Sequence, residues 1–154
     1  MKPMCLLVKM LILSIPLFLI GALSAPSWAA ETGTAAEARA MLEKAVEALK
    51  ANKADALAMF QKGEGGFKDR DLVVTCIGPD GTLSAHPVVR GFHVRYLVAA
   101  DGTLPYQEML KVAQEGKIDE ISFPFVRPHT TTPVRRVAYF TKVGDQVCNV
   151  GYHP

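Results

Sequence analysis

The sequence predicts an α+β domain in which a five-stranded antiparallel sheet carries helices on its faces. Apolar residues first recur at helical spacing, up to a glycine-rich stop at residues 63–66. After Gly66 the pattern changes to short β-rich runs separated by turn residues. The resulting order is one long helix, two strands, a short helix and three strands, and this order favours helices packed on an antiparallel sheet.

The long helix is expected to begin at Thr34. Thr34 and Glu37 have the spacing of a capping box, in which each residue bonds to the backbone amide of the other. The apolar positions that follow form one stripe, with charged residues between them and a weak point at Asn52. We expect this stripe to be core. Its members are Ala38, Met41, Leu42, Ala45, Val46, Leu49, Ala56, Met59 and Phe60.

The strands follow as hairpins. Residues 72–77 are β-rich, the turn Gly-Pro-Asp-Gly closes them, and residues 82–86 return antiparallel until Pro87, which has no N–H to donate. A short helix with proline near its start is expected over residues 105–113. The remaining strands are expected at residues 118–125, 134–143 and 146–152.

The N-terminus has the layout of a secretory signal peptide. A short basic start precedes an apolar run at residues 11–23, and small residues Ser27 and Ala29 offer cleavage before Ala30. We therefore expect residues 1–29 to be the signal peptide and residues 30–154 to be one domain, periplasmic or secreted. The apolar run is shorter than the ~20 residues of a spanning helix. An uncleaved N-terminal membrane anchor is the alternative.

Cleavage would leave a neutral domain. With Lys2 and Lys9 removed, 15 basic residues face 15 acidic ones, so no basic excess draws the chain to nucleic acid. Cys76 and Cys148 remain, and an even cysteine count in an exported chain indicates a disulfide. The first and last strands of such sheets often lie side by side, which would allow the pairing. Two free buried thiols are the alternative.

The sequence resembles the single Cache domains, exported small-ligand sensors with a PAS-like sheet. The resemblance covers roughly residues 37–152, and three segments carry it: DLVVTCIGPDGTLSAHP, DGTLPYQEMLKVAQEGKIDEISFPF and TTPVRRVAYFTKVGDQVCNVGY. It implies a PAS-like five-stranded antiparallel sheet, a long N-terminal helix and a small pocket between one sheet face and a helix–loop segment. Phe125-Val126-Arg127 and Arg135-Arg136 depart from the pattern common in similar sequences.

The resemblance also implies a ligand and partners. Many relatives bind short carboxylates as the outer domains of chemoreceptors or histidine kinases, so we expect a small organic anion and a membrane-bound receptor or kinase partner. It would also permit a homodimer through the N-terminal helix. No cofactor and no amino-acid ligand is expected. A non-catalytic protein-interaction subunit with the same fold is the alternative.

A carboxylate site needs a fixed cation or donor in an apolar wall. Arg127 alternates with Phe123 and Phe125, so the three share one strand face. Arg136 shares a face with Lys142, while Tyr139 lies on the other, and the sequence does not choose between them. Surface roles for the arginines and a structural role for His86 are the alternatives. The candidate ligand-binding residues are His86, Tyr106, Met109, Phe123, Phe125, Arg127, Arg136, Tyr139 and Lys142.

Enzyme signatures are missing from the sequence. It has no Gly-x-Ser-x-Gly elbow, no His-Glu-x-x-His pair, no phosphate-binding glycine loop and no Cys-x-x-Cys-His haem site. Its four histidines are scattered without metal-ligand spacing. We expect no catalytic residues and no metal.

Overall fold

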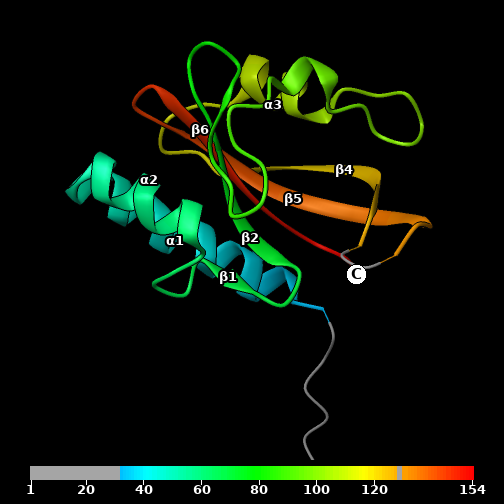
Figure 1. Ribbon diagram of the computed structural model, residues 1–154, viewed down its shortest axis with the longest axis horizontal. Helices are drawn as coiled ribbons and strands as arrows, with labels where there is room; N and C mark the ends of the chain where they lie inside the picture. The colour runs from blue at the N-terminus through cyan, green and yellow to red at the C-terminus, as the bar shows by residue number, and fades with distance from the viewer. Residues whose placement is uncertain (1–31, 128–129) are drawn as a thin grey trace, which may run out of the picture.

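The computed structural model describes residues 32–127 and 130–154. These form three α-helices, one 3-10 turn and six strands (Figure 1). In chain order they are α1 (Ala35–Ala51), α2 (Lys53–Lys62), β1 (Lys68–Asp69), β2 (Leu72–Ile77), β3 (Leu83–Ala85), η1 (Val94–Tyr96), α3 (Pro105–Val112), β4 (Asp119–Val126), β5 (Pro133–Val143) and β6 (Gln146–Tyr152). The expected signal peptide lies outside the described residues. Within them, no helix combines the length and apolarity needed to span a bilayer.

The expected long helix is two helices that meet at Asn52. The capping box at its start is confirmed, since the Glu37 amide donates to Thr34 Oγ1 at 3.2 Å and the Thr34 amide donates to Glu37 Oε2 at 2.8 Å. Asn52 has extended backbone angles, which end α1, and its side chain accepts from the Asp55 amide at 3.2 Å, which starts α2. The predicted weak point is therefore a helix junction.

All strand pairs are antiparallel, in the order β1-β2-β6-β5-β4, and β3 also pairs with β2. The first long strand, β2, and the last, β6, are neighbours, as expected. Cys76 and Cys148 are direct partners across them and form a disulfide, with the sulfur atoms 2.04 Å apart. The predicted α+β class and disulfide are confirmed. β1 adds a sixth strand that was not predicted, because two residues are too few to show an alternating pattern.

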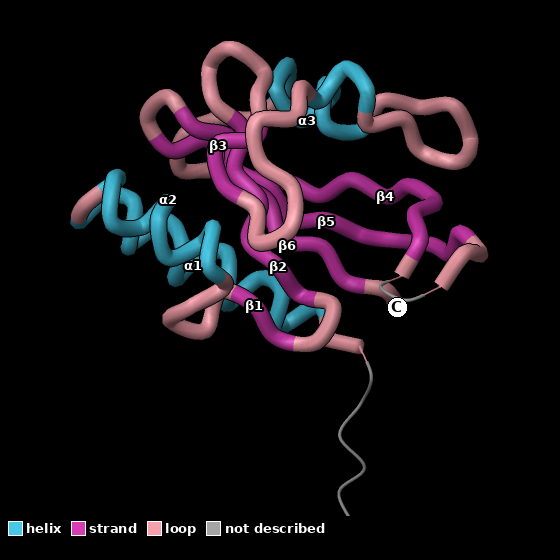
Figure 2. Tube along the Cα trace, in the orientation of Figure 1, coloured by secondary structure: helices cyan, strands magenta, loops and turns pink. Residues whose placement is uncertain are grey.

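The sheet separates two layers (Figures 1 and 2). Helices α1 and α2 cover one face, which we call the helix face; η1, α3 and their connecting segments cover the other, the α3 face. Each face has its own apolar cluster. The helix face buries Leu42, Ala45, Phe60, Leu72, Val74, Cys76, Cys148 and Val150. The α3 face buries Ile77, Leu83, Val94, Tyr106, Met109, Phe123, Ala138, Phe140 and Val147.

Candidate ligand-binding site

A row of side chains crosses the α3 face near one end of the sheet. Arg136 on β5 is the direct partner of Phe123 on β4. The β5–β6 register pairs Val137 with Tyr152, so the next residue outward, His153, lies beside Arg136 on the same face. His153 in turn contacts Asp71, which precedes β2: its amide donates to Oδ2 at 3.2 Å, and its Nδ1 lies 2.8 Å from that oxygen. The row joins four segments.

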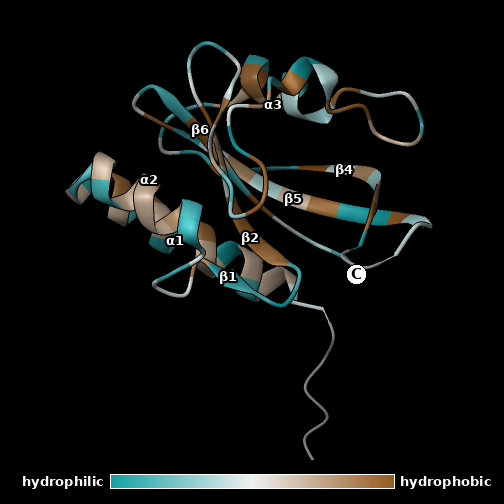
Figure 3. Cartoon of the chain, in the orientation of Figure 1, coloured by the Kyte–Doolittle hydropathy of each residue, from teal (hydrophilic) through white to brown (hydrophobic). Residues whose placement is uncertain are grey.

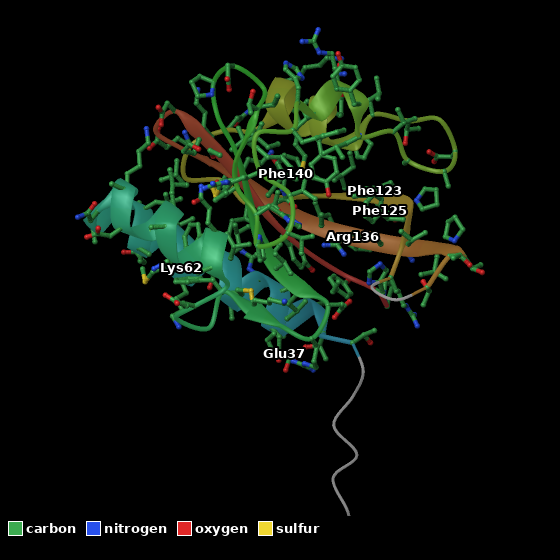
Figure 4. The ribbon with its side chains drawn as sticks, in the orientation of Figure 1. Glu37, Lys62, Phe123, Phe125, Arg136 and Phe140 are labelled. Carbon is green, nitrogen blue, oxygen red and sulfur yellow. A yellow bond between two sulfur atoms is a disulfide. The ribbon has the colours of Figure 1, made fainter. Side chains whose placement is uncertain are left out.

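Arg136 is the unusual member of this row. Its side chain is buried, with 9% of the residue exposed, and its Nε has no hydrogen-bond partner. Among the described residues no carboxylate forms an ion pair with it; its guanidinium lies 6.0 Å from the Phe125 ring. Figure 4 shows it on the sheet beside Phe123 and Phe125, with Phe140 further along β5, and in Figure 3 this part of β5 includes a hydrophilic stretch. A buried cation without a counter-charge is costly, so this site favours an anion.

Gly151 makes room for the guanidinium. The guanidinium of Arg136 lies over Gly151, whose cross-strand partner is Ala138. A Cβ added at Gly151 would overlap Arg136 Nε and lie 2.7 Å from Arg136 Cζ. The absence of a side chain at Gly151 therefore allows Arg136 to lie flat along the sheet instead of extending to solvent.

Arg127 and His153 each contain one further buried nitrogen without a hydrogen-bond partner among the described residues. Arg127 follows β4, is half-buried, and its Nε has no hydrogen-bond partner. His153 is 1% exposed, and its Nε2 also has none. Burial lowers the pKa of His153, Asp71 opposes that shift, and the charges of Arg136 and Arg127 lower the pKa further. Both arginines are thus close enough to act on the same imidazole.

His86 has a structural bond and a free donor. Its Nδ1 accepts from the amides of Val88 and Val89, at 3.1 and 3.0 Å, and so fixes the turn after β3. Burial lowers the pKa of His86, and the charges of Arg136 and then Lys68 lower it further. The imidazole is therefore neutral at pH 7, and because Nδ1 is the acceptor, Nε2 carries the proton. The structural role of His86 uses Nδ1 and leaves Nε2 available to a ligand, so a structural role and a binding role are compatible.

The α3 helix supplies the aromatic wall. Tyr106 is buried, and its ring centroid lies 6.0 Å from that of Phe123, which lies 6.0 Å from that of Phe125. Burial raises the pKa of Tyr106, with the Arg136 charge acting against it, so the hydroxyl stays neutral. Met109, one turn further along α3, is fully buried core. Five candidates, Tyr106, Phe123, Phe125, Arg127 and Arg136, therefore belong to one aromatic and cationic cluster on the α3 face.

The structure separates two candidates from this cluster. Tyr139 lies on the helix face, where it stacks on Tyr152 with ring centroids 6.1 Å apart. Side chains alternate along a strand, so Tyr139 and Arg136 cannot line one pocket. Lys142 shares the face of Arg136 but lies near the β5–β6 turn, six residues or roughly 20 Å along the strand. It is exposed in a cleft of about 420 Å³ between α1 and the α3–β4 connection. The structure therefore does not bring Tyr139 and Lys142 together with the other candidates.

A second cleft lies beside His86. It has a volume of about 320 Å³ and lies between α2 and the segment after β3. Its lining includes Lys62, His86 and Arg90, all capable of donating to an anion. The charge of Arg136 lowers the pKa of His86, so this cleft and the cluster interact electrostatically.

Asp71 and His153 were not among the predicted site residues. The disulfide could have identified them, because it fixes the β2–β6 register. Five residues outward from the Cys76–Cys148 pair on each strand are Asp71 and His153. Among the described residues, no group of three or more His, Cys, Asp or Glu side chains could hold a metal ion.

Comparison with known proteins identifies the fold. No family model matches the sequence, and a search of the curated proteins gives no match. Solved structures do match. A methyl-accepting chemotaxis protein from Vibrio parahaemolyticus is 17% identical with a TM-score of 0.61, over 77% of this chain and 86% of that one. The periplasmic sensor domain of a chemotaxis protein is 18% identical with a TM-score of 0.63, over 77% and 93%.

A third structure is a Cache chemosensory domain described for its carboxylic acid recognition. It is 15% identical to this chain with a TM-score of 0.54, over 74% of this chain and 84% of that one. The fold is that of a Cache sensor domain. At these identities the likeness shows the fold alone, and the Cache fold agrees with the α+β class and the strand order expected from the sequence.

Proposed function

We propose that this Cache-fold chain is an exported sensor domain that binds a small organic carboxylate on its α3 face. Arg136 and Arg127 hold the carboxylate. The Nε2–H of His86 and the hydroxyl of Tyr106 donate to it, and Phe123 and Phe125 form the apolar wall. The single observation that carries the proposal is the buried Arg136 without a counter-ion among the described residues. An anion would neutralise that charge, and a preformed cation in an apolar wall is what a carboxylate site requires.

The proposal includes a path by which the ligand enters and a partner that responds to ligand binding. The ligand passes the cleft lined by Lys62, His86 and Arg90, whose positive potential attracts anions. The bound state is reported to a membrane-bound receptor or kinase, and the domain performs no catalysis. The protein is periplasmic or secreted after its signal peptide is removed. A homodimer through α1 stays a prediction, and because the exposed side of α1 carries Arg39, Glu43, Glu47 and Lys50, such a dimer would form through charge.

A screen of short carboxylates by thermal shift tests the proposal. A ligand present at 100 times its Kd should add about 2.7 kcal/mol to the free energy of unfolding. Arg136→Met should abolish the shift, and Arg127→Ala should weaken binding. Arg135→Met is the matched control, because Arg135 is exposed and its Nε donates to Ser122 Oγ, at 3.0 Å. The proposal fails if no carboxylate raises the melting temperature, or if Arg136→Met binds as the natural chain does.

One observation favours the interaction-subunit alternative. Residues 88–98, within the connection between β3 and α3, expose large apolar side chains next to two arginines, Arg90 and Arg95, and this segment has no acidic residue. The exposed apolar residues are Val88, Val89, Phe92, Tyr96 and Val98. Exposed apolar patches mark interaction sites. This alternative gains if no carboxylate binds while Tyr96→Ser with Val98→Ser abolishes binding to a membrane receptor that the natural chain binds.

A further inference from the structure

Within residues 32–127 and 130–154, three buried side-chain nitrogens have no hydrogen-bond partner, and they differ in whether they can donate or accept. The two arginine Nε atoms, on Arg127 and Arg136, carry a hydrogen and can only donate. His153 Nε2 either donates or accepts, according to its tautomer and charge. If Nε2 accepts, a bound ligand must carry a hydrogen-bond donor beside its carboxylate. If Nε2 donates, the ligand must carry an acceptor there.

Asp71 determines the tautomer of His153. The Asp71 carboxylate accepts from the amide of Gly33 at 2.6 Å through Oδ1, and from the amide of His153 at 3.2 Å through Oδ2. A carboxylate acts only as a hydrogen-bond acceptor. His153 Nδ1, 2.8 Å from Oδ2, must therefore carry the proton. Nε2 has no proton as long as the imidazole is neutral.

The surroundings keep the imidazole neutral. The side chain of His153 is 0% exposed, so burial disfavours the imidazolium. The charged groups that act on it are Asp71 beside β2, Arg136 on β5 and Arg127 after β4. Burial and the two arginines lower its pKa, and Asp71 only partly offsets them. His153 Nε2 is then a buried acceptor without a donor, next to arginines that are donors without acceptors.

We propose that the site selects a short hydroxycarboxylate, whose carboxylate pairs with Arg136 while its hydroxyl donates a hydrogen bond to His153 Nε2. The inference rests on the proposed carboxylate function. Arg136 and His153 are cross-strand neighbours on one face, where Cβ atoms lie roughly 4.5–5.5 Å apart. Side chains that start so close can both be reached by one small molecule, and a carboxylate and a hydroxyl on adjacent carbon atoms, as in a 2-hydroxy acid, would supply the acceptor for Arg136 and the donor for His153 Nε2. A plain carboxylate would leave the buried acceptor unpaired.

Calorimetric titration with matched ligands tests this. Lactate is compared with propionate, and glycolate with acetate, each pair differing in one hydroxyl group. We expect each hydroxy acid to bind roughly tenfold to a hundredfold more tightly than its partner. His153→Phe should reduce that ratio to about one. His93→Asn is the control, since His93 caps η1 with Nδ1, which accepts from the Arg95 amide at 3.1 Å, and asparagine can replace that cap.

If His153→Phe does not fold, a second variant and a second measurement test the same inference. Asp71→Asn no longer fixes the tautomer, so the preference for the hydroxy acid should fall although Asp71 does not touch the ligand. The ¹⁵N chemical shifts of His153 should show a protonated Nδ1 and a bare Nε2 in the ligand-free protein. A doubly protonated ring in the free protein overturns the inference.

The failure of this inference is distinguishable from that of the proposed function. If both members of each pair bind equally well, the site reads the carboxylate alone, and only the hydroxyl selection is wrong. If none of the four acids binds and the thermal-shift screen of short carboxylates also finds no ligand, the carboxylate function is wrong as well.

Discussion

The two faces of the sheet are built from alternate residues of the same strands, yet they bury different chemistry. The helix face is apolar: Leu72, Val74 and Val150 pack beneath α1, together with the disulfide. The α3 face has an apolar cluster too, but near one end of the sheet it also encloses Arg136, His153 and Asp71. Apolar burial stabilises a fold, whereas unpaired buried polar groups oppose it. We therefore expect the helix face to supply most of the stability and, under the proposed function, the α3 face to bind the ligand.

Removing the disulfide should weaken the helix face most. For the Cys76→Ala/Cys148→Ala variant we expect a loss of about 4 kcal/mol, because the crosslink closes a loop of 72 residues in the unfolded chain. Urea denaturation measures it. Where the variant is folded, carboxylate binding should be unchanged, since both cysteines face α1. Binding that is lost with folding intact would contradict the division between the faces.

Gly151→Ala should disturb the α3 face. The added Cβ would displace the Arg136 guanidinium, and overpacking of this kind costs about 1–3 kcal/mol. Carboxylate affinity should fall as well. The control is the double variant Gly151→Ala/Arg136→Met: if the clash is with Arg136, the second change should recover much of the lost stability. Purely additive losses would show that Gly151 is needed for another reason.

Arg136→Met should raise the free energy of unfolding, whereas Gly151→Ala should lower it. Methionine fills a similar volume without a buried charge, so we expect the ligand-free domain to gain about 1 kcal/mol while carboxylate binding is lost. Arg135→Met should change both by little, because Arg135 is exposed. Chemical denaturation without ligand gives the comparison. A large loss of stability on Arg136→Met would mean that the arginine is structural.

The smallest expected effect is on pH dependence. The pKa values of His86 and His153 are both lowered below 6.5, so the unfolded chain binds protons at these residues more readily than the folded one. The free energy of unfolding should therefore be highest above pH 6.5 and fall as the pH falls below it. Denaturation at pH 7.5 and pH 5.5 measures this, and His153→Phe should show a smaller fall. Stability that rises on acidification would contradict it.

Local patterns predicted much of the fold. The capping box at Thr34, the glycine stop after α2 and the turn before β3 follow from short-range chemistry, and the disulfide followed from the central placement of β2 and β6. The break at Asn52 was visible only as a weakness, since a helix interior and a helix junction differ by a single residue's backbone angles. β1 is a strand because its two residues pair with β2, and the residues themselves carry no strand pattern.

The site was predictable in its residue types more than in its geometry. Alternation grouped Phe123, Phe125 and Arg127 correctly on one face. It could not choose between Arg136 and Tyr139, because that choice depends on which face α1 covers. His153 and Asp71 carried no local signal; they come together only through the pairing of two strands that are distant in sequence.

The Asp71 carboxylate also has a mechanical consequence. One of its oxygens holds Gly33, immediately before α1, and the other holds His153, next to the last residue of the chain. The two ends of the domain are thus tied to a single side chain, and the same side chain orients the imidazole. A displacement of the segment before α1 would therefore move the Asp71 carboxylate and with it His153. A displacement of His153 would in the same way act on the segment before α1.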